Sequence, residues 1–422
     1  MSDEGGTGPG TVRRTVGPVG DPVTVGWWES LWRPFWALPS AVVVVTVLAG
    51  ATLPLVDEHL LGDVDVLFGG NADSARSLLG TIASAMISVT GLVFSITMVV
   101  MQLASSQFTP RLLSTFLGSR VVQVTLGVFI SSFVFALMVL RDVRGGDGPF
   151  VPQLSVTVAF VLVLASVALF LAFIHHITDS IRVDQVVDRI ARLTVEALER
   201  GSAQEWDDTS AVPPTWSQGD GPGVTVTTGS EHGVVSRVHL SALVECAERT
   251  GAVVELRTRL GEVRHRGQVL AVVHGGRRDD DLAEAVRDAI GLGRERSMTQ
   301  DPEFGVRQLV DIAERALSPG VNDPTTAVQV LDELHRILRV AALRPDRSNL
   351  LVDGSGAVRV VDRPTTFARL LDLALDEVWH YGRDGLQVPR RIEDLLEDLV
   401  ADGRPEHAAT AAAKLAGLRR VA

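Results

Sequence analysis

Small and polar residues recur along one apolar stretch of the chain, at the spacing of a single helix face. The stretch, residues 77–110, carries no charge and is flanked by Arg76 and Arg111. Its recurring residues alternate between steps of four and three, with Met98 as the one large apolar member. The small and polar members are Ser77, Thr81, Ser84, Ser88, Gly91, Ser95, Gln102 and Ser105. Hydroxyl and amide oxygens in such a row either line an aqueous path through a membrane or contact a neighbouring helix.

The length of this stretch bears on both interpretations. A helix rises about 1.5 Å per residue and the hydrocarbon core is about 30 Å thick, so roughly 20 residues suffice to cross it. Residues 77–110 exceed that length, and their helix should tilt or project beyond the bilayer. Close packing is the ordinary use of small residues in membrane helices. The extent of the row, with Gln102 at one end, keeps a water-filled path as the second interpretation.

Charges are distributed unevenly on the two sides of the stretch. Acidic residues dominate the preceding loop, whereas the following turn from Arg111 to Arg120 contains no acid. Because short cytoplasmic loops are enriched in Lys and Arg, this turn should be cytoplasmic and the acidic loop external. The external acids would concentrate cations at an outer mouth. This predicted mouth consists of Asp57, Glu58, Asp63 and Asp65.

A second candidate site lies far along the chain, where two helices are predicted to begin. Asp-Pro pairs at 301–302 and 323–324 are typical helix starts, with Asp as the N-cap. Free N–H groups at helix N-termini bind anions, so the two starts would hold a phosphate-like group if they converge. In the alternative interpretation, the Asp301 and Asp323 carboxylates already occupy those N–H groups. The candidate anion-binding residues are Arg294, Arg296, Asn322, Thr325 and Thr326.

Composition excludes several classes of function. The chain has 422 residues, a formal net charge of −12 and no basic patch with interleaved aromatic residues, so we expect no nucleic-acid partner. Cys246 is its only cysteine and Lys414 its only lysine, which excludes a disulfide framework, Schiff-base chemistry and a P-loop. The sequence shows no catalytic or metal-ligand motif. We therefore predict neither an enzyme nor a cofactor.

Hydropathy predicts four membrane-spanning helices. Hydrophobic residues make up 46% of the chain and charged residues only 21%, which indicates a membrane part joined to a soluble part. With four spans and an external acidic loop, both termini should lie in the cytoplasm, and we expect the protein in the plasma (inner) membrane. The predicted spans are Phe35–Val56, residues 77–110, Val121–Leu140 and Leu154–Ile174.

The predicted architecture is a polytopic α-helical membrane domain followed by a cytoplasmic α+β domain, which has a small β module and a helical C-terminal part. Apolar residues at steps of three and four after the fourth span indicate either a coiled-coil seam or a helix lying on the soluble domain. The predicted segments are a disordered tail (1–26), the four-span domain (27–178), a helical extension of the fourth span (179–200), a linker (201–232), a small α+β module (233–275) and a mainly helical domain (276–422) with a hairpin at 351–361.

Two longer motifs carry a resemblance to a known family. The first is Gln102-Leu-Ala-Ser-Ser-Gln107, closely followed by Pro110-Arg-Leu-Leu113, and the second is Arg315-Ala-Leu-Ser-Pro-Gly-Val-Asn-Asp-Pro-Thr-Thr-Ala327. With these motifs the chain resembles, from its first span onward, a family of bacterial predicted membrane proteins, domain of unknown function 2254. The resemblance implies a four-span membrane part with a cytoplasmic C-terminal part. It brings no established activity and no catalytic residues.

Together these patterns predict an integral membrane protein of channel-like or transport type that forms a homo-oligomer. The second span would line a path shared with its symmetry mates, and the cytoplasmic domain would regulate that path. The expected partners are the lipid bilayer, further copies of the chain and a cytoplasmic anionic small molecule as effector. The alternative is a non-conducting membrane sensor or scaffold, in which the polar row only packs helices.

Overall fold

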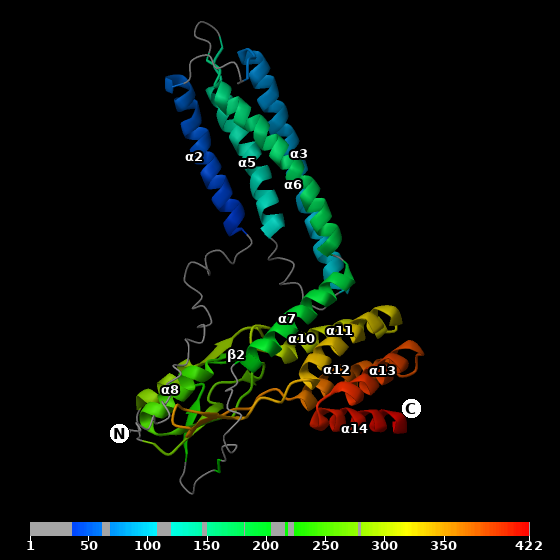
Figure 1. Cartoon of the computed structure of the whole chain (residues 1–422). Helices are drawn as coiled ribbons and strands as arrows, with labels where there is room; N and C mark the ends of the chain where they lie inside the picture. The colour runs from blue at the N-terminus through cyan, green and yellow to red at the C-terminus, as the bar shows by residue number, and fades with distance from the viewer. Residues whose placement is uncertain are drawn as a thin grey trace, which may run out of the picture.

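Four long helices form the N-terminal part of the protein, shown in Figure 1 as a computed structural model. They are α2 (Ala37–Leu60), α3 (Ala72–Gln107), α5 (Arg120–Asp142) and α6 (Gln153–Ser180). Each contains a window long and apolar enough to cross a membrane, so the four predicted spans are confirmed as candidate membrane helices. The predicted tail 1–26 lies outside the described residues. The structure describes residues 36–60, 68–107, 120–145, 150–180, 182–203, 216–217, 223–276 and 280–421.

Helix α5 is the centre of the four-helix bundle. It packs against α2, α3 and α6, and 56% of its most apolar window is buried, against 17–22% in the other three helices. Glycines allow helices α2 and α5 to approach each other closely. A Cβ added at Gly127 would lie 3.2 Å from the Cα of Pro39, and one at Gly50 would lie 3.1 Å from the sulfur of Met138. Small residues at these two levels therefore set the α2–α5 contact.

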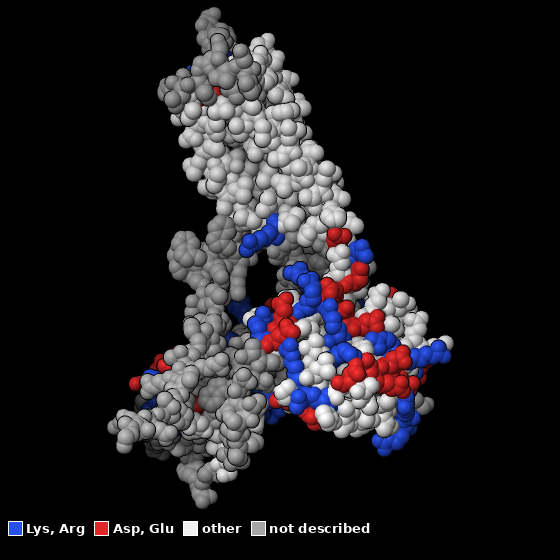
Figure 2. All heavy atoms as spheres, in the orientation of Figure 1, with Lys and Arg blue, Asp and Glu red and all other residues white. Residues whose placement is uncertain are grey.

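The surface of this bundle is apolar. Large exposed side chains include Leu48 on α2, Phe94 on α3, and Phe160 and Leu171 on α6. Figure 2 shows the bundle as an almost uncharged surface, whereas Lys, Arg, Asp and Glu interleave over the body beneath it. Exposed apolar side chains of this density are expected for helices surrounded by hydrocarbon, and interleaved charges are expected for a body surrounded by water.

The soluble region contains two β-sheets, flanked by helices α8 (Leu240–Thr250) and α9 (Asp280–Asp288). The larger sheet has the order β1-β5-β3-β8-β7 and the smaller one β4-β2-β6. All neighbouring strands are antiparallel except β3 and β8, which run parallel. The strands are β1 (Val224–Thr227), β2 (Gly233–Val238), β3 (Val253–Leu256), β4 (Val263–Arg264), β5 (Val269–His274), β6 (Ile290–Gly293), β7 (Leu350–Val352) and β8 (Val358–Val361).

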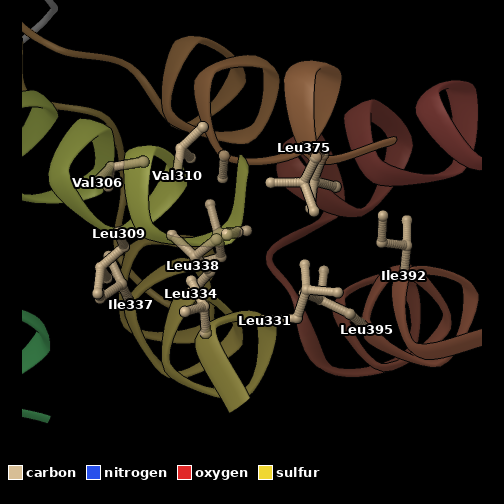
Figure 3. Packing of buried hydrophobic residues seen from close by; sticks show 14 of the residues in the cluster. Val306, Leu309, Val310, Leu331, Leu334, Ile337, Leu338, Leu375, Ile392 and Leu395 are labelled. Atoms are coloured by element: carbon tan, nitrogen blue, oxygen red, sulfur yellow. The ribbon is translucent and has the colours of Figure 1, made fainter. Parts of the chain in front are cut away.

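Six helices form a second body around their own apolar core. Figure 3 shows Val306, Leu334, Leu375 and Leu395 meeting there from four different helices. The first helix of the body contributes Ile190 to the same core. It is therefore an amphipathic helix lying on the soluble domain, which was one of the two interpretations left open by its sequence. The helices are α7 (Val183–Ala203), α10 (Pro302–Leu317), α11 (Pro324–Ala342), α12 (Phe367–Gly382), α13 (Gln387–Asp402) and α14 (Pro405–Val421).

The structure differs from the predicted segments of the soluble region. The segments 233–275 and 276–422 share both sheets, because β6 pairs with β2 and the β7–β8 hairpin pairs with β3. Strand β1 falls within the predicted linker 201–232 and pairs with β5. Local periodicity shows that a strand exists, but the partner strand is set by contacts distant in sequence. The boundary predicted at residue 275 therefore separates segments that share their sheets.

Helices α7 and α10 cross closely at Gly305. A Cβ added there would lie 1.9 Å from the Thr194 hydroxyl oxygen. Thr194 is fully buried and donates this hydroxyl to the Ile190 carbonyl oxygen at 2.7 Å. Because α6 ends at Ser180 and α7 begins at Val183, the fourth membrane helix leads directly into the core of the helical body. The crossing thus fixes α7, the helix that follows α6 in the chain, to the helical body.

We expect Gly305→Ala to destabilise the helical body by about 1–3 kcal/mol, the usual cost of overpacking a core, because the new methyl group would overlap Thr194. Thermal unfolding of the full-length protein in detergent should show a lower Tm. Gly417→Ala, where an added Cβ meets no atom within 4 Å, is the matched control inside helix α14 and should leave the Tm unchanged or raise it, because Ala favours a helix more than Gly does. Adding Thr194→Ala to Gly305→Ala should restore part of the loss. An unchanged Tm for Gly305→Ala would contradict the close crossing.

Candidate functional site: the exposed polar face of α3

Helix α3 has two opposite faces of different chemistry. The face toward α5 and α6 is apolar and buried, with Ala75, Leu79, Ile82, Met86 and Val93. Each of these residues is followed two positions later by a member of the predicted row, which is a rotation of about 200° on a helix. The described members of the row are exposed on the outside of the bundle: Ser77, Thr81, Ser84, Ser88, Gly91, Ser95 and Gln102. The row therefore does not pack against the other three helices of its own bundle. The Ser105 side chain lies outside the described residues.

Two hydroxyls on this polar face donate to their own helix. Thr81 Oγ1 donates to the Ser77 carbonyl oxygen at 2.8 Å, and Ser88 Oγ donates to the Ser84 carbonyl oxygen at 2.9 Å. The proton of each hydroxyl is thus used inside the helix, while its oxygen lone pairs remain available as acceptors. Such oxygens can accept hydrogen bonds from water or contact a small cation. The described part of the row carries no charged side chain, so the face is polar without being ionised.

Asp57, predicted to line an outer acidic mouth, caps a helix instead. Its Oδ1 accepts a hydrogen bond from the Leu154 N–H at 3.0 Å, and its Oδ2 accepts from the N–H and hydroxyl of Ser155 at 3.1 and 2.8 Å. The residue is only 8% exposed. An aspartate from α2 therefore satisfies free N–H groups at the start of α6, which corrects the predicted role of Asp57. The Glu58 side chain, Asp63 and Asp65 lie outside the described residues.

Helix α10 begins at the first of the two predicted anion sites, and the Asp301 carboxylate occupies that site. Arg296 donates to Asp301 Oδ2 through Nε and Nη2 at 2.9 and 2.8 Å, and its guanidinium lies 5.1 Å from the Phe304 ring centroid. Asp301 also accepts the Phe304 N–H at 3.1 Å, which confirms it as the predicted N-cap. Burial raises the pKa of Asp301, while the Arg296 charge favours its ionised form. Arg294 is exposed.

The second helix start is occupied in the same way. Asp323 accepts the Thr326 N–H at 3.1 Å and the Thr326 hydroxyl at 2.6 Å, and these hydrogen bonds hold the pKa of Asp323 below its usual range. Asn322 and Thr325 are exposed, and Asn322 adopts a left-handed conformation with φ of 48°. The two starts are separated by α10, which rises about 24 Å over its 16 residues. The structure does not bring the five predicted anion-binding residues into one site.

Two polar contacts had no clear signal in the sequence. Ser132 of α5 and Ser166 of α6 hydrogen-bond each other at 3.1 Å inside the bundle. In the soluble body, Arg307 contacts carboxylates on α10 and also Glu377 on α12. The spacing along α10 is visible in the sequence, but the partner 70 residues away is not. Among the residues that the structure describes, no three His, Cys, Asp or Glu side chains gather as a metal site.

These features define a class of protein, with four candidate membrane helices, an outward polar face on the second and a soluble helical and β-sheet region. The chain belongs to the family described as Predicted membrane protein (DUF2254), whose model matches residues 32–398, and the resemblance noted in the sequence is thereby confirmed. Two uncharacterised relatives, Mb1321c of Mycobacterium bovis and Rv1290c of Mycobacterium tuberculosis, are each 31% identical over 359 residues, covering 82% of this chain and 68% of theirs. No solved structure matches the chain.

Removing the Asp57 carboxylate should loosen the α2–α6 contact. We expect Asp57→Ala to lower the free energy of unfolding of the membrane part by about 1–2 kcal/mol, a typical loss for a helix cap. Thermal unfolding in detergent measures the change. Asp73→Ala is the control, because it removes an aspartate at the same end of the bundle whose side chain is 90% exposed and whose described ion pair is a 3.5 Å contact with Arg76 of its own helix. Equal losses for both variants would show that Asp57 has no special capping role.

Proposed function

We propose that the chain is one subunit of a homo-oligomeric membrane protein of channel-like or transport type, in which the polar face of α3 lines a path shared between copies. The direction of that face supports the proposal, since it points away from α5 and out of the bundle. In a single copy within a bilayer, this face would meet lipid, where oxygen acceptors find no donors. Copies arranged around a symmetry axis would enclose a water-filled path between their α3 helices. Water in that path would donate hydrogen bonds to the acceptor oxygens.

The extent of the polar face also supports a path through the bilayer. From Ser77 to Gln102 the helix rises about 38 Å at 1.5 Å per residue, more than the roughly 30 Å of hydrocarbon. The described positions between these ends include hydroxyl-bearing residues at each turn or two, as well as Gly91. The polar row would therefore be continuous across the membrane. Hydroxyl oxygens suit the passage of water, small cations or other small polar solutes.

The soluble region would regulate this membrane part. Helix α7 belongs to the core of the helical body and follows α6 in the chain after only two residues. A change in the packing of α7 would therefore act on the end of α6 nearest the body. Allosteric coupling of this kind is typically worth about 1–3 kcal/mol, which is enough to shift an equilibrium between two membrane states noticeably.

We also propose a location and an orientation, namely the plasma membrane with both termini in the cytoplasm. The support is the charge bias of the loops in the sequence, with acids between the first two spans and only arginines as charged residues in the turn from Arg111 to Arg120. This orientation puts the soluble region in the cytoplasm.

The main alternative is a non-conducting sensor or scaffold, in which the α3 faces of two copies pack directly on each other. Gly91 favours this arrangement, because a Cβ added there would meet no atom within 4 Å and the backbone is open to close approach. Both proposals place α3 at an interface between copies. They differ in whether water reaches the face.

Cysteine accessibility tests the proposed path. Cys246 is the only cysteine and is buried, so Cys246→Ala gives a background without thiols. In that background we expect Ser84→Cys, Ser88→Cys and Ser95→Cys to react with a small charged methanethiosulfonate reagent in native membranes, because the reactive thiolate forms in water. Mass spectrometry of the purified protein measures the extent of labelling.

The matched controls are Leu92→Cys and Phe94→Cys, on exposed apolar positions that flank the polar face of α3. These positions should face lipid and stay unlabelled. Equal labelling of polar and apolar positions would argue against a path along this face. If Ser88→Cys forms a disulfide between copies on oxidation but resists the reagent when it is kept reduced, the face packs without water and the scaffold interpretation holds.

The orientation has its own test in intact cells. An impermeant thiol reagent added outside should label Asp73→Cys at the start of α3, because this exposed position lies at the proposed external end. The same reagent should label Glu284→Cys on α9 only after the cells are lysed, since the soluble region would be inside. Labelling of Glu284→Cys but not of Asp73→Cys in intact cells would overturn the proposed orientation. The proposed path would still be tested separately by the cysteine-accessibility experiment.

A further inference from the structure

Three carboxylates surround one guanidinium where α12 packs on α10. Arg307 donates to Asp311 Oδ1 through Nε at 2.6 Å, to Glu314 Oε1 through Nη2 at 3.1 Å, and to Glu377 of α12 through Nη1. The Arg307 and Glu314 side chains are each 23% exposed and that of Asp311 is 7% exposed. The Glu377 side chain is 48% exposed, so a single positive charge faces three acids in a contact that is buried at Asp311 and open to water at Glu377.

Glu314 and Glu377 bind two nitrogens of the same guanidinium, Nη2 and Nη1, which brings their carboxylates together. Two ionised carboxylates at such a contact repel each other and have no donor between them, whereas a proton on one of them allows it to donate to the other. Burial, followed by a hydrogen bond with Glu377, raises the pKa of Glu314 to about 7, while the same hydrogen bond lowers the pKa of Glu377. A proton held between the two carboxylates therefore favours this contact.

A second ion pair joins the same two helices, because Arg369 of α12 donates to Glu303 of α10 at 2.7 Å. Helix α7 and helix α11 also pack on α10, and there Arg336 of α11 pairs with Asp188 of α7 at 3.3 Å. Helix α14 packs on α12, and Lys414 pairs with Asp372 and Asp376 there. The charged groups that shift the pKa of Glu314 are the three partners already named, on α10 and α12. Loss of the shared proton therefore acts on the part of the α10–α12 contact around Arg307, while the Arg369–Glu303 pair remains.

We propose that the proton shared by Glu314 and Glu377 makes the α10–α12 contact a pH-sensitive clasp, which loosens as the pH rises above neutral. Loss of the proton leaves two carboxylates side by side and removes the donor between them. Because α10 crosses α7 at Gly305 and α7 leads into α6, loosening would reach the membrane part. An effect on a path along α3 rests on the proposed function, whereas the clasp itself does not.

The direction of the pH effect follows from the raised pKa of Glu314. The folded protein holds this proton more tightly than the unfolded chain, in which the carboxyl group has its ordinary pKa of 4.5. The stabilisation is therefore fully present below pH 4.5 and is lost as the pH rises through about 7. Between pH 6 and pH 8 the contact should change from mostly protonated to mostly ionised.

Hydrogen exchange of the full-length protein in detergent measures the clasp locally. After correction for the intrinsic pH dependence of exchange, peptides from α12 should exchange faster at pH 8 than at pH 6 in the natural chain. In Glu314→Gln the amide donates to Glu377 without a titrating proton, so α12 should exchange equally at both pH values. Thermal unfolding gives a second readout, and the Tm decrease from pH 6 to pH 8 should be about 2–4 °C smaller in Glu314→Gln than in the natural chain.

Glu284→Gln is the matched control, because it removes an exposed glutamate on α9 and should keep the pH dependence of the natural chain. Glu377→Gln provides a second test if Glu314→Gln folds poorly, since its amide can donate to an ionised Glu314. The clasp is overturned if α12 in the natural chain exchanges equally at pH 6 and pH 8, or if Glu314→Gln and Glu377→Gln both retain its pH dependence. None of these measurements requires transport, so they can fail or succeed independently of the accessibility of α3.

Discussion

Burial of α5 on several sides is the constraint on which the rest of the membrane part depends. Its apolar and small residues accept α2, α3 and α6 as neighbours, and α3 can meet this centre with only one face. That face is the apolar one, which places the polar row on the opposite side of the helix. The position of Asp57 follows from the same packing, because α2 and α6 lie close enough for an aspartate on one to cap the other.

The soluble region obeys a different constraint, which is that both of its sheets are completed from distant parts of the chain. Strand β3 has β5 on one side and β8 on the other, so the C-terminal half is needed to complete the larger sheet. The helical body is likewise built from α7 and from helices that follow the smaller sheet. Helix α7 contributes to the apolar core of the helical body, so any motion of α7 also moves that body.

Features encoded locally could be predicted from the sequence, and features set by distant contacts could not. The four spans follow from uncharged runs of sufficient length, and the Asp301 and Asp323 caps follow from Asp-Pro pairs. Periodicity also identified the polar row of α3, but it could not show that the row points out of the bundle, which depends on the packing of α5. The cap formed by Asp57 and the contact between Arg307 and Glu377 join residues 98 and 70 positions apart, and no local pattern reports such pairs.

The parallel pairing of β3 with β8 has a consequence for how the protein is made. During synthesis, β3 emerges from the ribosome long before β8 and presents an unpaired edge until residues 358–361 follow. Open strand edges make folding intermediates prone to aggregate. All four membrane helices precede β3 in the chain, so they are available for insertion before the sheet can be completed. A nascent chain that already contains the four described candidate membrane helices therefore still carries an unfinished sheet.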